Sequence, residues 1–194
     1  MKLTRQQLTL LTIFALFLAP LLMVMIMRSP WWEYQPAALK NHGQLVQPPV
    51  QLPIIKAVEG KWLLLYVISG PCERKCTDTI TSLRQIHKAA GRQQEHLAIV
   101  ILNKAGADPE LQSRIESIYT GFNFVSDAST ATIAKLEQIN ATLRSSEDRP
   151  DSILTYVLDP MHNVILAYGD EPNANNINKD LKRLLKWSKQ DTVP

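Results

Sequence analysis

The sequence predicts an α/β domain, a central mixed sheet flanked by helices, that follows one N-terminal transmembrane helix. Three observations support this prediction. An uncharged apolar run of 20 residues occupies positions 8–27. Two nearly continuous apolar segments, residues 62–69 and 96–102, have the composition of strands buried on both faces. An amphipathic helical pattern separates these two segments, and such a strand, helix, strand unit places its strands parallel.

Composition limits the class of protein. The chain has 194 residues, 45% hydrophobic and 20% charged, which suits one domain and excludes an intrinsically disordered chain. Three of the 21 basic residues, Lys2, Arg5 and Arg28, precede residue 30, where there is no acid, so the remainder carries 18 basic against 18 acidic residues. The net charge of +3 therefore does not indicate nucleic-acid binding, which requires clustered cations.

The run at residues 8–27 has the length of a membrane anchor. At 1.5 Å per residue it spans the ~30 Å hydrocarbon core of a bilayer, and transmembrane helices tolerate an internal proline such as Pro20. A cleaved signal peptide is the alternative, but it requires a shorter apolar region and a small-residue cleavage site, which the sequence lacks. We therefore expect an uncleaved anchor.

Charges and aromatic residues around the anchor favour one orientation. Lys2 and Arg5 lie in the N-terminal segment 1–7, whereas Arg28 on the other side is followed by residues typical of the membrane interface: Trp31, Trp32 and Tyr34. This pattern favours a cytoplasmic N-terminus and export of the remainder. For a bacterial chain, we expect a single-pass inner-membrane protein with its domain in the periplasm, where disulfides are permitted.

Residues 28–55 are rich in Pro, Gln and aromatic residues. Because Pro is excluded from helix interiors and central strands, we interpret them as an extended stalk leading into an edge strand or hairpin. The predicted α/β domain then occupies residues 56–194. Beyond the first two strands, we expect helices at residues 72–90, 109–119, 129–143 and 175–189, and strands at residues 122–125, 153–158 and 164–168.

Local signals support several of these boundaries. Asp108 is a suitable N-cap for the helix from residue 109, and Gly91 is a suitable stop for the helix from residue 72. The turn at residues 159–163 contains Pro and Asn and connects the last two strands as a hairpin. The resulting order, β, α, β, α, β, α, β-hairpin, α, is the pattern of a thioredoxin-like domain.

The two cysteines of the chain, Cys72 and Cys76, occur in the segment GPCERKC, where a buried strand gives way to a helix. An i, i+4 spacing on a helix brings both sulfurs to one face, close enough to bridge or to bind one soft metal ion. The amides of a helix N-terminus stabilise a thiolate, and Arg74 and Lys75 add positive charge that Glu73 partly opposes.

A structural disulfide or two inert thiols are the alternatives. A bridge across so short a loop constrains the unfolded chain very little, and inert thiols are usually scattered through core strands. We therefore favour a functional pair. The spacing is CxxxC, so the CxxC redox motif of thioredoxins is absent.

The segment GKWLLLYVISGPCERKCTDTITSLRQIH, the strand HLAIVILN and the later TYVLDPMHNVILAYG resemble the SCO/SenC family over roughly residues 45–189. Members of that family are membrane-anchored, thioredoxin-fold proteins that assemble the copper centre of cytochrome c oxidase. The resemblance implies that Cys72 and Cys76 bind copper. The family's third ligand is a His, and matching on Tyr156 and Asp159-Pro160 places that position at or near Asp151, so the histidine is missing here.

No other soft ligand is expected at the thiols. His87 falls far down the helix, His42 lies in the stalk, and the topology places His96 and His162 at the opposite end of the sheet. Glu73, Asp78 and Asp151 are oxygen donors, which suit Cu(I) poorly, and Met161 belongs to the distant hairpin.

Two functions follow. The first is a membrane-anchored SCO-like factor for oxidase assembly, possessing thiol-disulfide oxidoreductase or Cu(I)-binding activity, in which Cys72 attacks and Cys76 resolves. Its partners would be the inner membrane and cytochrome c oxidase subunits or other assembly factors, with copper as the one expected metal and no nucleic acid. The second is a non-catalytic, oxidase-associated scaffold or interaction protein with vestigial thiols.

Overall fold

The structure, a computed structural model, describes residues 5–27, 41–53, 58, 60–126, 129–144, 153–169 and 173–188. The chain divides into two compact units, Met1–Lys40 and Asn41–Pro194, and each is described by itself. In the first unit, α1 (Arg5–Met27) contains Pro20 and is, by length and composition, a helix that could cross a membrane. Residues 1–4 and 28–40 of the predicted N-terminal segment and stalk lie outside the described residues.

The second unit is built on a six-stranded mixed sheet, in the order β1-β6-β5-β2-β3-β4. Strands β2, β3 and β4 are parallel, whereas β5 pairs antiparallel with β2 and β6, and β1 pairs antiparallel with β6. Their bounds are β1 (Gln44–Gln51), β2 (Trp62–Ile68), β3 (Leu97–Asn103), β4 (Phe122–Val125), β5 (Ile153–Leu158) and β6 (Asn163–Gly169).

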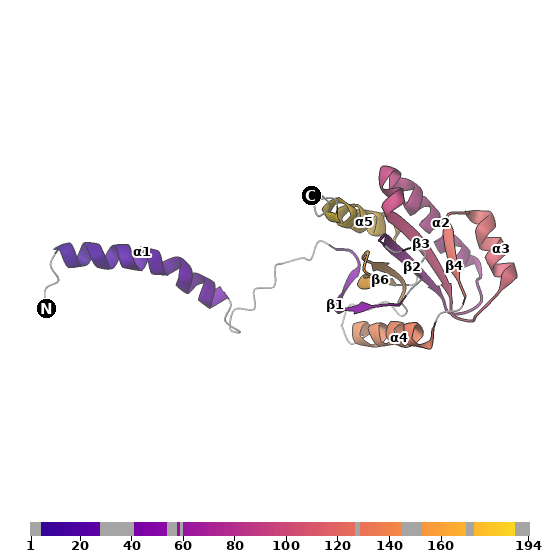
Figure 1. Cartoon of the computed structure of the whole chain (residues 1–194), viewed down its shortest axis with the longest axis horizontal. Helices are drawn as coiled ribbons and strands as arrows, with labels where there is room; N and C mark the ends of the chain where they lie inside the picture. Colours follow the sequence, from indigo (N-terminus) through magenta and orange to yellow (C-terminus); the bar gives the residue numbers. More distant parts are fainter. Residues whose placement is uncertain are drawn as a thin grey trace. The chain divides into compact units, whose positions relative to one another are not determined.

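Helices cover both faces of this sheet. Figure 1 shows α2 and α5 over one face and α4 over the other. The helices are α2 (Arg74–Ala89), α3 (Pro109–Ile118), α4 (Thr130–Arg144) and α5 (Ala174–Ser188), with a 3-10 helix, η2 (Gly91–His96), between α2 and β3. The predicted α/β, thioredoxin-like architecture is confirmed.

Strand β2 is buried along its whole length because the sheet is covered on both faces. Leu64 and Tyr66 pack in the layer formed with α2, α3 and α5, whereas Leu63 and Leu65 pack in the layer formed with α4 and β1. Successive side chains of a strand point to opposite faces, so both sets must be apolar. This arrangement explains the continuous apolar run in the sequence.

Strand β1 lies at an edge of the sheet and belongs to the same compact unit as the other strands. Its register on β6 is interrupted between Leu45 and Val50, the stretch that contains Pro48 and Pro49. Proline cannot donate to a strand ladder, and an edge position tolerates it. The Pro-rich segment, expected to lead into an edge strand or hairpin, thus contains the edge strand β1.

A buried carboxylate fixes the residues that lead into β1. Asp180 of α5 is 2% exposed, and its Oδ2 accepts hydrogen bonds from the amides of His42 (2.8 Å) and Gly43 (3.0 Å) and from the hydroxyl of Tyr168 (2.9 Å). A Cβ at Gly43 would lie 2.6 Å from the ring of Tyr168. The start of β1 is thus held against α5 and β6 at a position that only glycine fits.

Candidate redox site

The cysteine pair lies at the carboxyl edge of the parallel strands. After β2 ends at Ile68, the exposed residues Ser69, Gly70 and Pro71 lead to Cys72. The amide of Lys104, just beyond β3, donates to the carbonyl of Ile68 at 2.9 Å and joins the ends of the two strands. The site therefore lies at the joined ends of two strands that are buried along their whole length.

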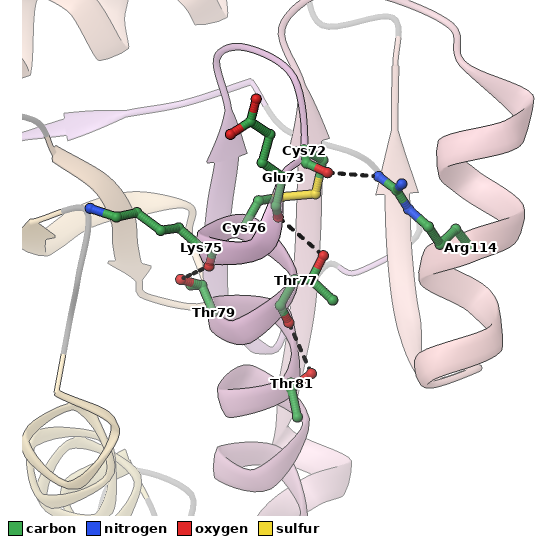
Figure 2. Close-up of a disulfide and its surroundings, with 8 residues drawn as sticks. All are labelled: Cys72, Glu73, Lys75, Cys76, Thr77, Thr79, Thr81 and Arg114. Atoms are coloured by element: carbon green, nitrogen blue, oxygen red, sulfur yellow. Dashed lines mark hydrogen bonds between the residues drawn. A yellow bond between two sulfur atoms is a disulfide. The ribbon is translucent and has the colours of Figure 1, made fainter.

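Cys72 and Cys76 form a disulfide, with their Cα atoms 5.1 Å apart. Both residues are half-buried and pack against the layer of core residues that α2 shares with α3 and α5. Figure 2 shows the bridge lying across the first turn of α2. The structure brings together the two residues that the sequence indicated as the reactive pair.

Helix α2 begins at Arg74 and not at residue 72 as predicted, so Cys72 precedes the helix. Glu73 is the N-cap in an extended conformation, and its amide donates to the carbonyl of Pro71 at 3.0 Å. This tight turn folds Cys72 back over the first helical turn. The cysteines therefore meet across a helix start, and not along one helix face as their i, i+4 spacing suggested.

The first turn of α2 lacks a side-chain cap. Glu73 makes no side-chain capping hydrogen bond, and Figure 2 shows its carboxylate extending away from the disulfide. The Glu73 carbonyl instead accepts from the amide and hydroxyl of Thr77 at 3.1 and 3.2 Å. Because the positive end of the helix dipole is not screened by a capping carboxylate, it favours negative charge on a nearby sulfur.

Arg114 of α3 contacts the site from a distant part of the sequence. Its Nη2 donates to the carbonyl oxygen of Cys72 at 2.9 Å, as Figure 2 shows. The carboxylate of Asp108 accepts from the amide of Leu111 at 2.9 Å and caps α3, as the sequence predicted. Sequence reasoning missed Arg114, because nothing local marks a residue 42 positions away as a neighbour.

The charged residues beside the cysteines lie at the surface. Arg74 and Asp78 form an ion pair at 3.9 Å with side chains 95% and 74% exposed. Such an exposed pair contributes little to stability, because solvent screens it. The helix dipole and Arg114 are therefore better placed than Arg74 to supply positive potential at the Cys loop.

The described residues offer no third ligand next to the two sulfurs. Within the described ranges, no three His, Cys, Asp or Glu side chains are grouped so as to hold a metal ion. Asp151, the position matched to the family histidine, lies outside the described residues, as does Pro150. Cys72 and Cys76 remain the only soft donors that the described structure places at this site.

The four histidines have other surroundings. His87 lies with Nδ1 2.9 Å from the Tyr119 hydroxyl and Nε2 3.1 Å from the Leu97 carbonyl oxygen, so both ring nitrogens are engaged. His96 precedes β3 at the opposite end of the sheet, and His162 lies in the β5-β6 turn together with exposed Met161. The His42 amide is bonded to Asp180.

The fold and this paired-cysteine site define a thioredoxin-like protein. The family model for the transmembrane-like, thioredoxin-like, C-terminal domain matches residues 62–188, and the chain belongs to that family. A search of curated proteins found no match.

Solved structures of SCO proteins share the fold. The apo Sco1 protein from Thermus thermophilus has a TM-score of 0.53 at 16% identity, over 74% of this chain and 96% of that chain. A SCO1/SenC family lipoprotein from Bacillus anthracis has a TM-score of 0.51 at 18% identity, over 72% and 98%. Yeast Sco1 with copper bound has a TM-score of 0.51 at 15% identity, over 68% and 82%. The resemblance to SCO/SenC proteins is thus confirmed at the level of the fold.

Proposed function

We propose that this chain is a membrane-anchored SCO-like factor that assists assembly of the copper centre of cytochrome c oxidase through Cys72 and Cys76. The observation that carries the proposal is the disulfide at the start of α2 in a thioredoxin-like domain. A bridge of four-residue separation adds little stability through chain entropy, so its position at the sheet edge is better explained by chemistry.

Thiol-disulfide exchange is the reaction that these residues support best. In the reduced protein, the Cys72 thiolate attacks one sulfur of a partner disulfide and the other partner sulfur leaves as a thiolate. The Cys76 thiolate then attacks the Cys72 sulfur, which forms the Cys72–Cys76 disulfide and releases the second partner thiolate. The chain is oxidised by two electrons and the partner is reduced by two. The α2 N-terminus and Arg114 favour the thiolate at the Cys loop.

Cu(I) binding is the second proposed use of the same sulfurs. After reduction, two thiolates are soft donors of the kind that Cu(I) prefers, and yeast Sco1 has been crystallised with copper bound. Copper would be cargo delivered to the oxidase. The described residues supply two donors and no third, so exchange is the better-supported activity.

We further propose that α1 anchors the chain in the bacterial inner membrane, with the N-terminus in the cytoplasm and residues 56–194 in the periplasm. The length and apolar composition of α1 support the anchor, and the exported location supplies the oxidising compartment that the disulfide requires. Alkaline phosphatase fused after residue 194 should be active, whereas the same enzyme fused before α1 should be inactive.

Complementation tests the thiol mechanism. In a strain lacking the chain, Cys72→Ser/Cys76→Ser should restore neither oxidase activity nor the copper-centre spectrum, whereas Ser69→Ala, a change at an exposed position in the same loop, should restore both. Full restoration by the double variant would instead establish the scaffold role. Membrane levels of each variant, compared by immunoblot, exclude loss of the protein as the cause.

Copper titration separates the two uses of the sulfurs. The reduced full chain is titrated with Cu(I) against a chromophoric chelator, with the oxidised chain as the matched control. Binding of about one Cu(I) by the reduced chain alone would support the cargo role. Absence of binding together with exchange against a model disulfide would assign the site to redox chemistry only.

A further inference from the structure

Four exposed basic side chains run along the outward face of α5: Lys179, Lys182, Arg183 and Lys186, here called the α5 stripe. With 3.6 residues per turn, these positions lie opposite the buried side chains of Ile177, Leu181 and Leu185. Asp180, the one acid in the sequence of α5, is buried and bonded to the start of β1 and to Tyr168. The exposed charged residues of α5 are therefore all basic.

The other described helices of the domain carry charges of both signs. Helix α2 has four basic residues and one exposed acid, Asp78, which is paired with Arg74. On α4, Glu137 is paired with Lys104, and the Lys135 ammonium donates to the Gln51 carbonyl at 2.7 Å. Helix α3 contains two acids and one arginine. Helix α5 differs from these helices because its one acid, Asp180, is buried, so no acid lies on its exposed face.

The chain segment that leads to α1 attaches to the domain at the same helix. The amides of His42 and Gly43 donate to Asp180, so the tether meets the domain at the flank of α5, and Figure 1 shows α5 close to the start of β1. Even fully extended, residues 28–40 span at most roughly 45 Å. A membrane that holds α1 would therefore lie within a limited distance of the α5 stripe.

We propose that the α5 stripe docks on anionic lipid headgroups of the membrane in which α1 is anchored. This inference rests on the anchoring proposed above and is independent of the cysteine chemistry. The apolar side of α5 is used by the domain core, so the contact is electrostatic and does not require insertion. It acts only within about one Debye length, roughly 8 Å at physiological salt, and salt weakens it. Docking would limit rotation of the domain about its tether.

Energy transfer in lipid nanodiscs tests the docking. The full chain is reconstituted in phosphatidylcholine, or in equal parts phosphatidylcholine and phosphatidylglycerol, with acceptor-labelled lipids. A fluorescent amino acid replaces exposed Asn175 at the start of α5, or exposed Ala134 on α4 as a reference position. Transfer from position 175 should rise with phosphatidylglycerol, exceed transfer from position 134, and fall as NaCl is raised to about 1 M.

Charge variants identify the responsible residues. Lys179→Gln/Lys182→Gln/Lys186→Gln should lower the ratio of docked to undocked domain on the order of 100-fold. The matched variant, Lys61→Gln/Arg92→Gln/Lys104→Gln, removes the same charge from exposed positions outside α5 and should preserve the signal.

Two outcomes would overturn the proposal in different ways. A chain that alkaline carbonate washes from the bilayer would contradict the anchoring and the docking together. The docking alone would be contradicted if the chain stays in the bilayer but energy transfer does not respond to lipid charge, salt or the α5 substitutions. That result is expected if the stripe binds an acidic protein instead. Oxidase complementation by the lysine variant then reports separately on the proposed function.

Discussion

The hydrogen bond from Arg114 to the Cys72 carbonyl couples α3 to the loop that holds the disulfide. An arginine there has two effects on the reduced protein. It restrains the loop through its donor, and it places a positive charge near the sulfur that is proposed to attack. Because Arg114 is exposed, solvent screens both effects, and we expect a modest contribution.

Arg114→Met should slow alkylation of the reduced protein by iodoacetamide at neutral pH about two-fold, because it removes the donor and the charge. Arg114→Lys keeps the charge and loses the planar fork of donors, so its alkylation rate should lie between the rates of Arg114→Met and the parent. Arg92→Met, at an exposed position in η2, serves as the charge-matched control. Equal rates in the parent and Arg114→Met would show that Arg114 has no influence on the thiols.

Only the local part of the site, the pairing of the two cysteines, could be predicted from the sequence. Cys72 and Cys76 are four positions apart and follow a buried strand, so their proximity is a local property. The reversal of the chain at Pro71 and Glu73 depends on detailed backbone angles and was missed. Arg114 was missed for a different reason: its contact depends on how α3 packs beside α2, which periodicity does not specify.

At the scale of elements, the long periodic segments were well predicted. Strands β4 and β5 have the predicted bounds, and α3 begins at Pro109 as its capping residue indicated. Continuous apolar runs and capping residues are local consequences of burial and hydrogen bonding, so they are readable along the chain. The junction of β1 with α5 was not predicted, because Asp180 meets His42 and Gly43 across 138 and 137 positions.

Helix α3 provides a test of capping. Asp108→Ala should lower the free energy of unfolding by about 1 kcal/mol, because the Leu111 amide loses its acceptor. Asp108→Ser should recover most of this loss, since serine also caps. Urea denaturation followed by circular dichroism measures each change. Glu110→Ala, an exposed change in the same turn, should stay within about 0.5 kcal/mol of the parent. A cost for Asp108→Ala no larger than for Glu110→Ala would contradict the capping role.

At the scale of the whole molecule, two buried tyrosines link stability to pH. Burial raises the pKa of Tyr156 to about 12, despite an opposing hydrogen bond to Asn140. Burial, then the charge of Asp180 and then the hydrogen bond to it, raise the pKa of Tyr168 well above its ordinary value of 10. Both hydroxyls therefore stay protonated in the folded domain under conditions that ionise them in the unfolded chain.

The sign of the pH effect follows directly. A raised folded pKa gives stability that is fully present below the unfolded pKa near 10 and is lost as pH rises through the folded value.

For the chain in detergent micelles, each tyrosine should therefore lower the free energy of unfolding by about 1.4 kcal/mol between pH 9 and pH 11. Tyr156→Phe loses the Asn140 bond at every pH, yet between pH 9 and pH 11 its free energy of unfolding should fall by about 1.4 kcal/mol less than that of the parent. Urea unfolding at each pH gives these slopes, and absorbance at the phenolate band should show ionisation of the two residues only on unfolding. Identical slopes in the parent and Tyr156→Phe would mean that Tyr156 ionises as readily in the folded domain as in the unfolded chain.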